Sequence, residues 1–133
     1  MSIYSSGVAM SQKIPDNIKK GVSGFRGIYP SPLSPEFVLK LSMAVGTFFK
    51  GNPVVVGTDT RLSRDVLSSA VISGLTSCGC SVYFLGVVPT PTVEVNVLKH
   101  KASAGIIISA SHNPAEWNAL KIVGRDGCFL TQE

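Results

Sequence analysis

Ser111 is the residue of this sequence best placed to do chemistry. It lies in the polar run 109–114, Ser-Ala-Ser-His-Asn-Pro, which directly follows the apolar run 104–108, Ala-Gly-Ile-Ile-Ile. The apolar run predicts a buried strand, and the proline and polar side chains predict that the strand ends there. We therefore expect Ser111 on an exposed loop at the carboxyl end of a strand, where open α/β sheets place their functional groups.

Three roles for Ser111 are open on the residues alone. As an ordinary turn residue it needs no further explanation, because Ser, Asn and Pro are common in loops. A hydrolase nucleophile is expected in a Gly-x-Ser-x-Gly motif, whereas Ser111 is flanked by Ala110 and His112. A phosphoryl carrier needs an exposed hydroxyl on a rigid loop, cations that hold an anion, and usually a divalent metal. The stretch fits the phosphoryl carrier best.

Three segments of the sequence together resemble one enzyme family. Residues 109–114, with 117–121 (Trp-Asn-Ala-Leu-Lys) just after them, resemble the active-serine loop of the α-D-phosphohexomutases, which include phosphoglucomutase, phosphomannomutase and phosphoglucosamine mutase. Residues 23–27 (Ser-Gly-Phe-Arg-Gly) resemble the N-terminal arginine loop of that family, and 56–61 (Val-Gly-Thr-Asp-Thr-Arg) resemble its second strand and the following turn. The segments follow one another in the family's order, and the resemblance spans about residues 21–130.

This resemblance implies an enzyme that moves a phosphoryl group between the 1- and 6-positions of a hexose phosphate. The phosphoserine form of Ser111 would give its phosphoryl group to the sugar and recover one from the resulting hexose 1,6-bisphosphate. The resemblance implies catalytic roles for Ser111, Lys121, Arg26 and His112. It implies that substrate or phosphate is bound by Ser23, Arg26, Asn113, Asn118, Asp59 and Arg61.

Several of these residues also have an ordinary structural interpretation. Arg26 fits a surface arginine beside a turn, and Lys121 fits a strand lysine that faces solvent. Asp59 and Arg61 fit a local ion pair at a turn, which would contribute little to stability. His112 fits an imidazole that only fixes the loop. A non-catalytic domain that binds anions or a protein partner is therefore the alternative function for the same fold.

The resemblance also implies parts that this sequence does not contain. The expected cofactor is Mg²⁺, but the sequence has no Asp-Gly-Asp cluster, so Ser111 would reach the metal only through its phosphate. We expect the hexose phosphate substrate and the remaining mutase domains as partners, and little turnover by these residues alone. Two positions depart from the family pattern, since Ala119 and Val22 stand where many members have Gly and Thr.

The composition describes one packed domain that attracts anions. Of the 133 residues, 44% are hydrophobic and 15% are charged, which argues against disorder of the whole chain. The net charge is +4 without a basic run interleaved with aromatic residues, so we expect a phosphorylated small molecule and no nucleic acid. No apolar run reaches the roughly 20 residues of a membrane helix. The odd set of cysteines, Cys78, Cys80 and Cys128, fits free thiols in a cytoplasmic protein.

Strand and helix patterns alternate along the chain. Strands are expected near 24–29, 53–57, 81–86 and 106–108, and helices are expected after Ser34-Pro35, Ser63 and Thr90-Pro91. The turn signal Asp126-Gly127 predicts a final hairpin between 119–123 and 128–130. We therefore expect a three-layer α/β/α sandwich with a mostly parallel mixed sheet and an antiparallel edge hairpin. Residues 1–20 are expected to form a loose arm before a domain at 21–133.

Overall fold

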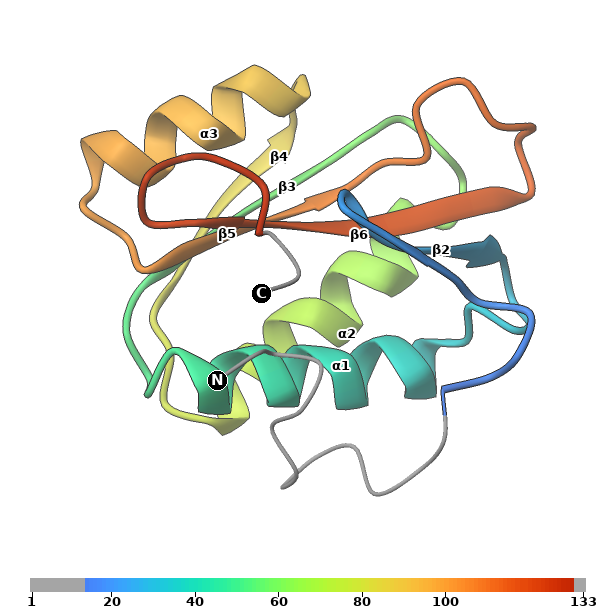
Figure 1. Cartoon of the computed structure of the whole chain (residues 1–133), viewed down its shortest axis with the longest axis horizontal. Coiled ribbons are helices and arrows are strands. Elements are labelled where there is room, and N and C mark those ends of the chain that lie inside the picture. Colours follow the sequence, from blue (N-terminus) through green and yellow to red (C-terminus); the bar gives the residue numbers. More distant parts are fainter. Residues whose placement is uncertain (1–13, 131–133) are drawn as a thin grey trace.

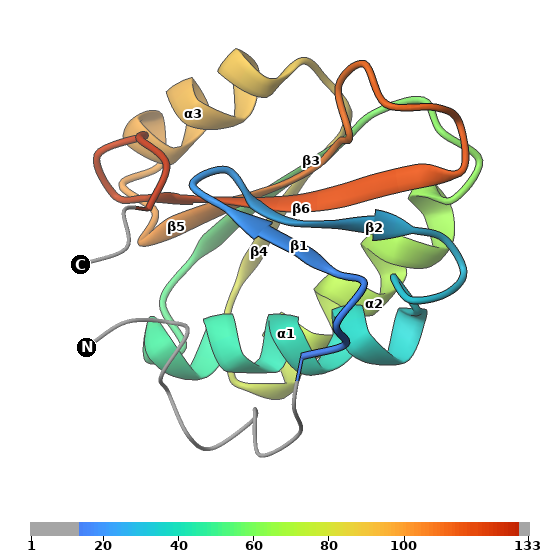
Figure 2. The same ribbon diagram turned by 45° about the vertical axis from the view of Figure 1, so that its right-hand side comes forward.

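The computed structural model describes residues 14–130, which form one sheet with helices on both faces. In chain order the elements are β1 (Lys19–Gly21), β2 (Gly24–Ile28), α1 (Pro35–Phe48), β3 (Val54–Thr58), α2 (Arg64–Ser77), β4 (Val82–Val87), α3 (Thr90–Lys99), β5 (Ala104–Ile108) and β6 (Trp117–Gly124). Figure 1 and Figure 2 show α1 and α2 below the sheet and α3 above it. The expected α/β/α sandwich is confirmed.

The strand directions correct the expectation of a mostly parallel sheet. The strand order is β1-β2-β6-β5-β3-β4. β3 is parallel to β4 and β5, whereas β6 is antiparallel to β5 and to β2, and β1 is antiparallel to β2. β6 therefore lies inside the sheet and not at its edge. The reason is that β5 and β6 are joined by a loop without a crossover helix, and such a loop suits antiparallel neighbours.

The final hairpin is smaller than predicted. Its turn forms at Asp126-Gly127, where Gly127 has a φ of 75° and the N–H of Gly124 donates to the carbonyl of Cys128 over 2.9 Å. The expected second strand at 128–130 is reduced to one bridge between Val123 and Phe129. The chain after β6 thus turns back without adding a strand to the sheet.

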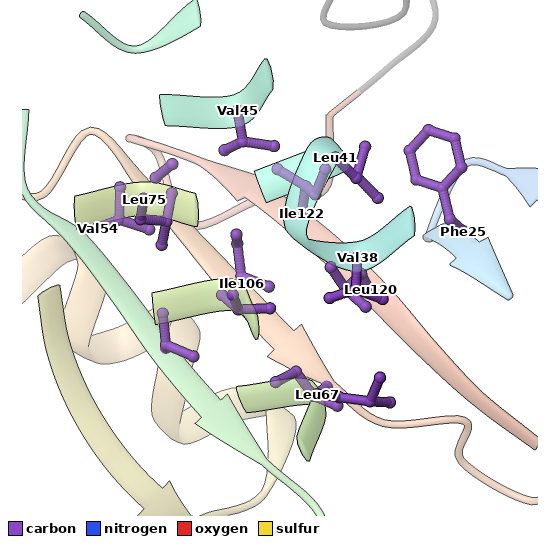
Figure 3. Packing of buried hydrophobic residues seen from close by; sticks show 14 of the residues in the cluster. Phe25, Val38, Leu41, Val45, Val54, Leu67, Leu75, Ile106, Leu120 and Ile122 are labelled. Carbon is purple, nitrogen blue, oxygen red and sulfur yellow. The ribbon is translucent and has the colours of Figure 1, made fainter. Parts of the chain in front are cut away.

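The two faces of the sheet have separate cores because successive strand residues point to opposite faces. Val54, Ile106 and Leu120 point toward α1 and α2, and Figure 3 shows them packed with Val38 and Leu41. On the opposite face, a second cluster joins strand residues to α3: Val55, Val93, Val97, Ile107 and Val123. Since α3 packs mainly on β3 and β5, no described helix lies over this face of β1, β2 and part of β6.

The first two helices begin in different ways. The hydroxyl of Ser34 accepts a hydrogen bond from the N–H of Phe37 at 3.0 Å, which confirms the predicted cap of α1. Ser63 makes no such cap for α2, and its hydroxyl instead accepts from Nδ2 of Asn118 at 2.8 Å. Among the described residues, no helix has the length and apolar character needed to cross a membrane.

Part of the expected N-terminal arm belongs to the fold. Lys19–Gly21 forms β1, and Ile18 packs in the core with an exposed fraction of 5%. The turn into β2 depends on Gly24, which has a φ of 113° and where a Cβ would collide with the backbone carbonyl of Leu120. The expected arm is therefore wrong for residues 14–20, because their backbone and apolar side chains find partners. Residues 1–13 lie outside the described residues.

Candidate active site

Ser111 lies on the loop between β5 and β6, at the carboxyl end of β5. Its side chain is exposed, and its backbone adopts a left-handed conformation with a φ of 56°. Such a conformation costs an L-residue about 1–2 kcal/mol. Within the loop, the N–H of Ser111 donates to the hydroxyl of Ser109 at 3.3 Å. The loop presents the Ser111 hydroxyl to solvent in a conformation that needs support from outside the loop.

Lys121 connects the interior of the sheet to this hydroxyl. It lies on β6 opposite Ile107 and is only 6% exposed, yet its Nζ donates to Ser111 Oγ over 2.7 Å. Burial is the main cause that lowers the pKa of Lys121, the charge of Arg26 adds to it, and Asp59 acts in the opposite direction. Lys121 is therefore not a strand lysine in solvent, but a partly desolvated amine aimed at one hydroxyl.

Arg26 brings a second cation to the same loop. Its Nη1 donates to Oδ1 of Asn113 at 2.7 Å. Arg26 lies on β2 opposite Ala119 of β6, so its side chain shares a sheet face with Lys121, two residues along β6. The side chain of Asn113 thereby holds the guanidinium of Arg26 beside the serine loop.

Arg61 holds the loop through its backbone. Nη1 of Arg61 donates to the carbonyl of Pro114 at 2.6 Å, and Nη2 donates to the carbonyls of Ser111 at 3.2 Å and Asn113 at 2.8 Å. Asp59 fixes this guanidinium, because its two carboxylate oxygens accept from the backbone N and from Nε of Arg61 at 3.1 and 3.0 Å. The pair thus braces the carbonyls of the serine loop, and its hydrogen bonds are largely used there.

The remaining predicted site residues lie in three different settings. His112 is exposed on the loop, and its side chain makes no hydrogen bond to another described residue. Ser23 is half-buried in the turn between β1 and β2. Asn118 is fully buried, with Nδ2 donating to Ser63 and Oδ1 accepting from the N–H of Ala119 at 2.9 Å. The amide of Asn118 therefore joins β6 to α2 and is not offered to a ligand in this structure.

The structure also places Lys19 beside the site, a residue that the sequence reasoning missed. A depression of about 220 Å³ beside the β1–β2 turn is lined by Lys19, Lys20, Gly21, Ser23, Gly24 and Arg26. The ammonium of Lys19 lies 5.2 Å from the centre of the Trp117 ring. No motif in the sequence indicates this arrangement, because it depends on the pairing of β1 with β2 and of β2 with β6.

A metal ion would find few protein ligands here. Among residues 14–130, no three His, Cys, Asp or Glu side chains are grouped so that they could hold one. The cysteines in this range are free thiols, and burial raises the pKa of Cys80. The described residues therefore do not fit a complete Mg²⁺ site.

Comparison with known families decides what kind of domain carries this site. The family model described as "Phosphoglucomutase/phosphomannomutase, alpha/beta/alpha domain I" matches residues 17–133. The chain belongs to this family. Its fold is also similar to a Burkholderia thailandensis structure described as a phosphoglucomutase/phosphomannomutase family protein, with a TM-score of 0.72 and 28% identity over 80% of this chain and 26% of that one.

Curated relatives in the phosphoglucomutase/phosphomannomutase family carry several substrate names. The chain is 45% identical to a phosphoglucosamine/phosphogalactosamine mutase of Sulfurisphaera tokodaii over 114 residues, and 43% identical to a phosphoglucomutase/phosphomannomutase of Thermococcus kodakarensis over 118 residues. It is 44% identical to a phosphoglucosamine mutase of Bartonella tribocorum over 118 residues. Each match covers 85% of this chain but only 25 or 26% of the relative. The chain thus spans about a quarter of the length of these curated relatives.

Proposed function

We propose that this domain supplies the phosphoryl-carrying serine of a hexose phosphate mutase. The observation that carries the proposal is the 2.7 Å hydrogen bond from Lys121 Nζ to the exposed Ser111 Oγ. A phosphate on Ser111 would bring a charge of about −1.5 to −2 near neutral pH. Lys121 and Arg26, which share one face of the sheet, would compensate that charge.

The same contact also explains how protons can move during phosphoryl transfer. When the phosphoryl group leaves Ser111 for a sugar hydroxyl, the bond from phosphorus to Ser111 Oγ breaks and a bond to the sugar oxygen forms. Lys121 gives its proton to Ser111 Oγ and takes the proton of the sugar hydroxyl, so its charge is restored. A lowered pKa eases the first of these transfers, because the ammonium releases its proton more readily. Arg26 remains charged and orients the phosphate.

The rest of the mutase reaction is proposed for the longer protein that the relatives represent. There we expect a hexose 1- or 6-phosphate as substrate, hexose 1,6-bisphosphate as intermediate and activator, and Mg²⁺ bound in part by the phosphate of Ser111. The other domains of such a protein would be the partners of this one. Alone, residues 1–133 are expected to accept a phosphoryl group without completing the mutase cycle.

The direct test is to incubate the chain with glucose 1,6-bisphosphate and Mg²⁺ and to measure its intact mass. We expect the mass of one phosphoryl group to be added, and peptide mapping should place it on Ser111. The Ser111→Ala variant should gain none, while Ser109→Ala should still be modified. The proposal would be refuted if Ser111 stayed without phosphate both in this chain and in a full-length protein that contains this chain.

A further inference from the structure

The face of β1, β2 and β6 that carries no described helix holds a row of cations. Lys19 of β1 lies directly opposite Arg26 of β2, and Arg26 lies opposite Ala119 of β6. Directly opposite residues of antiparallel strands point to the same face, and so do residues two apart on one strand. Lys19, Arg26 and Lys121 therefore project from one face of the sheet, on the side of the serine loop.

This row has no internal compensation among the described residues. Like charges that lie directly opposite one another on paired strands are destabilising. The ion pairs between two described residues join Lys40 to Glu36, Arg61 to Asp59 and Arg64 to Asp65, and none of these three involves the row. Asp59 is the carboxylate that affects Lys121, but it is already paired with Arg61. The unfavourable arrangement is explained if an anion completes it.

We propose that Lys19 and the β1–β2 turn form a subsite that captures the phosphate group of a phosphorylated sugar before it reaches Ser111. The depression of about 220 Å³ beside the turn provides the space, with Lys19, Arg26 and Ser23 among its lining residues. Gly21 leaves this surface open, since a Cβ there would meet no atom within 4 Å. Trp117 orients the ammonium of Lys19 by a cation–π contact.

The subsite adds Lys19 of β1 to the proposed active site. Two strand spacings, about 10 Å, separate β1 from β6. Lys19 therefore meets a phosphate that has not yet arrived between Lys121 and Ser111, while Arg26 on β2 lies between the two positions. Cations along such a path raise the local concentration of an anionic substrate and its rate of association. The identity of the anion rests on the proposed function, but the binding of phosphate at the turn does not.

The test uses Trp117, the only tryptophan of the chain, as a reporter. A Ser111→Ala form, which cannot be phosphorylated there, is titrated with glucose 1,6-bisphosphate, inorganic phosphate and inorganic sulfate, followed by fluorescence and by amide NMR shifts. We expect shifts at 19–26, and weaker binding by about threefold to fivefold after Lys19→Met. Lys99→Met, which makes the same charge change at an exposed position of α3, should bind as the parent does. The sugar phosphate should bind more tightly than either inorganic anion.

Three results would overturn the subsite. They are unchanged affinity after Lys19→Met, an equal loss after Lys99→Met, and amide shifts at 111–121 without any at 19–26. Equal binding of sulfate and the sugar phosphate would overturn the assignment of the ligand as a phosphorylated sugar. If Ser111 gains no phosphoryl group in the unmodified chain or in a full-length protein that contains it, while Lys19-dependent binding is retained, the proposed function is refuted and the subsite is left in place.

Discussion

Among single residues, Lys121 combines an unfavourable position with a favourable contact. Lys121 is only 6% exposed and is affected by the charge of Arg26, so its charged form costs the fold free energy, and its lowered pKa expresses that cost. This cost is offset by the hydrogen bond to the hydroxyl of Ser111 and by the phosphate that we propose for Ser111, and not by packing within the fold. If Lys121 serves phosphoryl transfer and not folding, measuring both the activity and the stability of one variant should show it.

Lys121→Met should separate activity from stability. The methionine keeps the apolar stem but removes the buried charge, so we expect the free energy of unfolding at pH 7 to be unchanged or higher by about 1 kcal/mol. Phosphoryl transfer to Ser111 should fall by a factor of about 100 or more, because the proton donor is lost. Urea unfolding and the rate of phosphate incorporation are the measurements. A variant that is equally active, or that is several kcal/mol less stable, would contradict this role.

The sequence could indicate which side chains meet where a motif spaces them. The spacing of Ser111 and Lys121 matches a family motif, and the structure brings the two atoms into contact. Arg61 was predicted at the site, but not its targets, because backbone carbonyls leave no mark in a sequence. Asn118 was expected to bind a ligand, since an amide beside a motif can serve a ligand or a neighbouring helix, and only the packing distinguishes them.

Two links between elements determine the shape of the site. Arg61, in the segment between β3 and α2, holds the loop that joins β5 to β6, and Asn118 of β6 holds Ser63 at the start of α2. The two links tie the β3–α2 connection to the serine loop and to β6, the strand that follows that loop. The positive φ of Ser111 is sustained by these contacts and not by a local glycine.

Arg61→Lys tests the first link, since lysine keeps the charge but cannot match the fork of five N–H donors. We expect the backbone amides of residues 111–113 to exchange with solvent about tenfold faster. In a full-length enzyme, kcat should fall about tenfold with little change in KM, because the loop is mispositioned while the cations that bind phosphate remain. Arg64→Lys is the matched control, as Arg64 bonds only to its own segment. Equal effects of the two substitutions would contradict a positioning role.

Asn118→Ala tests the second link. The substitution leaves the hydroxyl of Ser63 and the N–H of Ala119 without their partner in a buried setting, which should lower the free energy of unfolding by about 1–3 kcal/mol. Asn52→Ala provides the comparison, because Asn52 is exposed and bonds only to the nearby carbonyl of Phe49. That variant should change stability by less than about 0.5 kcal/mol. Chemical denaturation of both proteins decides the point.

At the scale of elements, the sequence indicated which segments form helices and strands but not how the strands are ordered. Ser34-Pro35 and Thr90-Pro91 carry local signals that mark helix starts, and the structure has helices there. The position of β6 between β2 and β5 depends on which apolar faces fit together across the sheet, and no local signal encodes it. The same is true of β1, whose lysines resemble a solvated arm until they pair with β2.

The whole molecule divides its sheet between two tasks. Helices lie on both sides of the part of the sheet that contains β3 and β5, while no described helix lies over one face of the antiparallel end formed by β1, β2 and β6, beside the serine loop (Figure 2). The packed part supplies the stability, and the open part gathers cations. The net charge is +4, and three of the cations lie close together. Lys19, Arg26 and Lys121 share one face of the sheet beside the serine loop, where an anion can approach.

This division predicts how the stability of the unphosphorylated chain depends on pH. The pKa of Lys121 is lower in the folded chain than its ordinary value of 10.5, so the unfolded state binds its proton more tightly. Wherever the amine is protonated in both states, its burial opposes folding. As the pH rises through the folded pKa, the folded state loses the proton first, so the free energy of unfolding should increase until about pH 10.5. Lys121→Met should lack this increase, and the difference between the two proteins in urea unfolding from pH 7 to 10 isolates it. Phosphate on Ser111 should weaken the increase by favouring the charged amine, whereas equal slopes in both proteins would show that Lys121 carries no such cost.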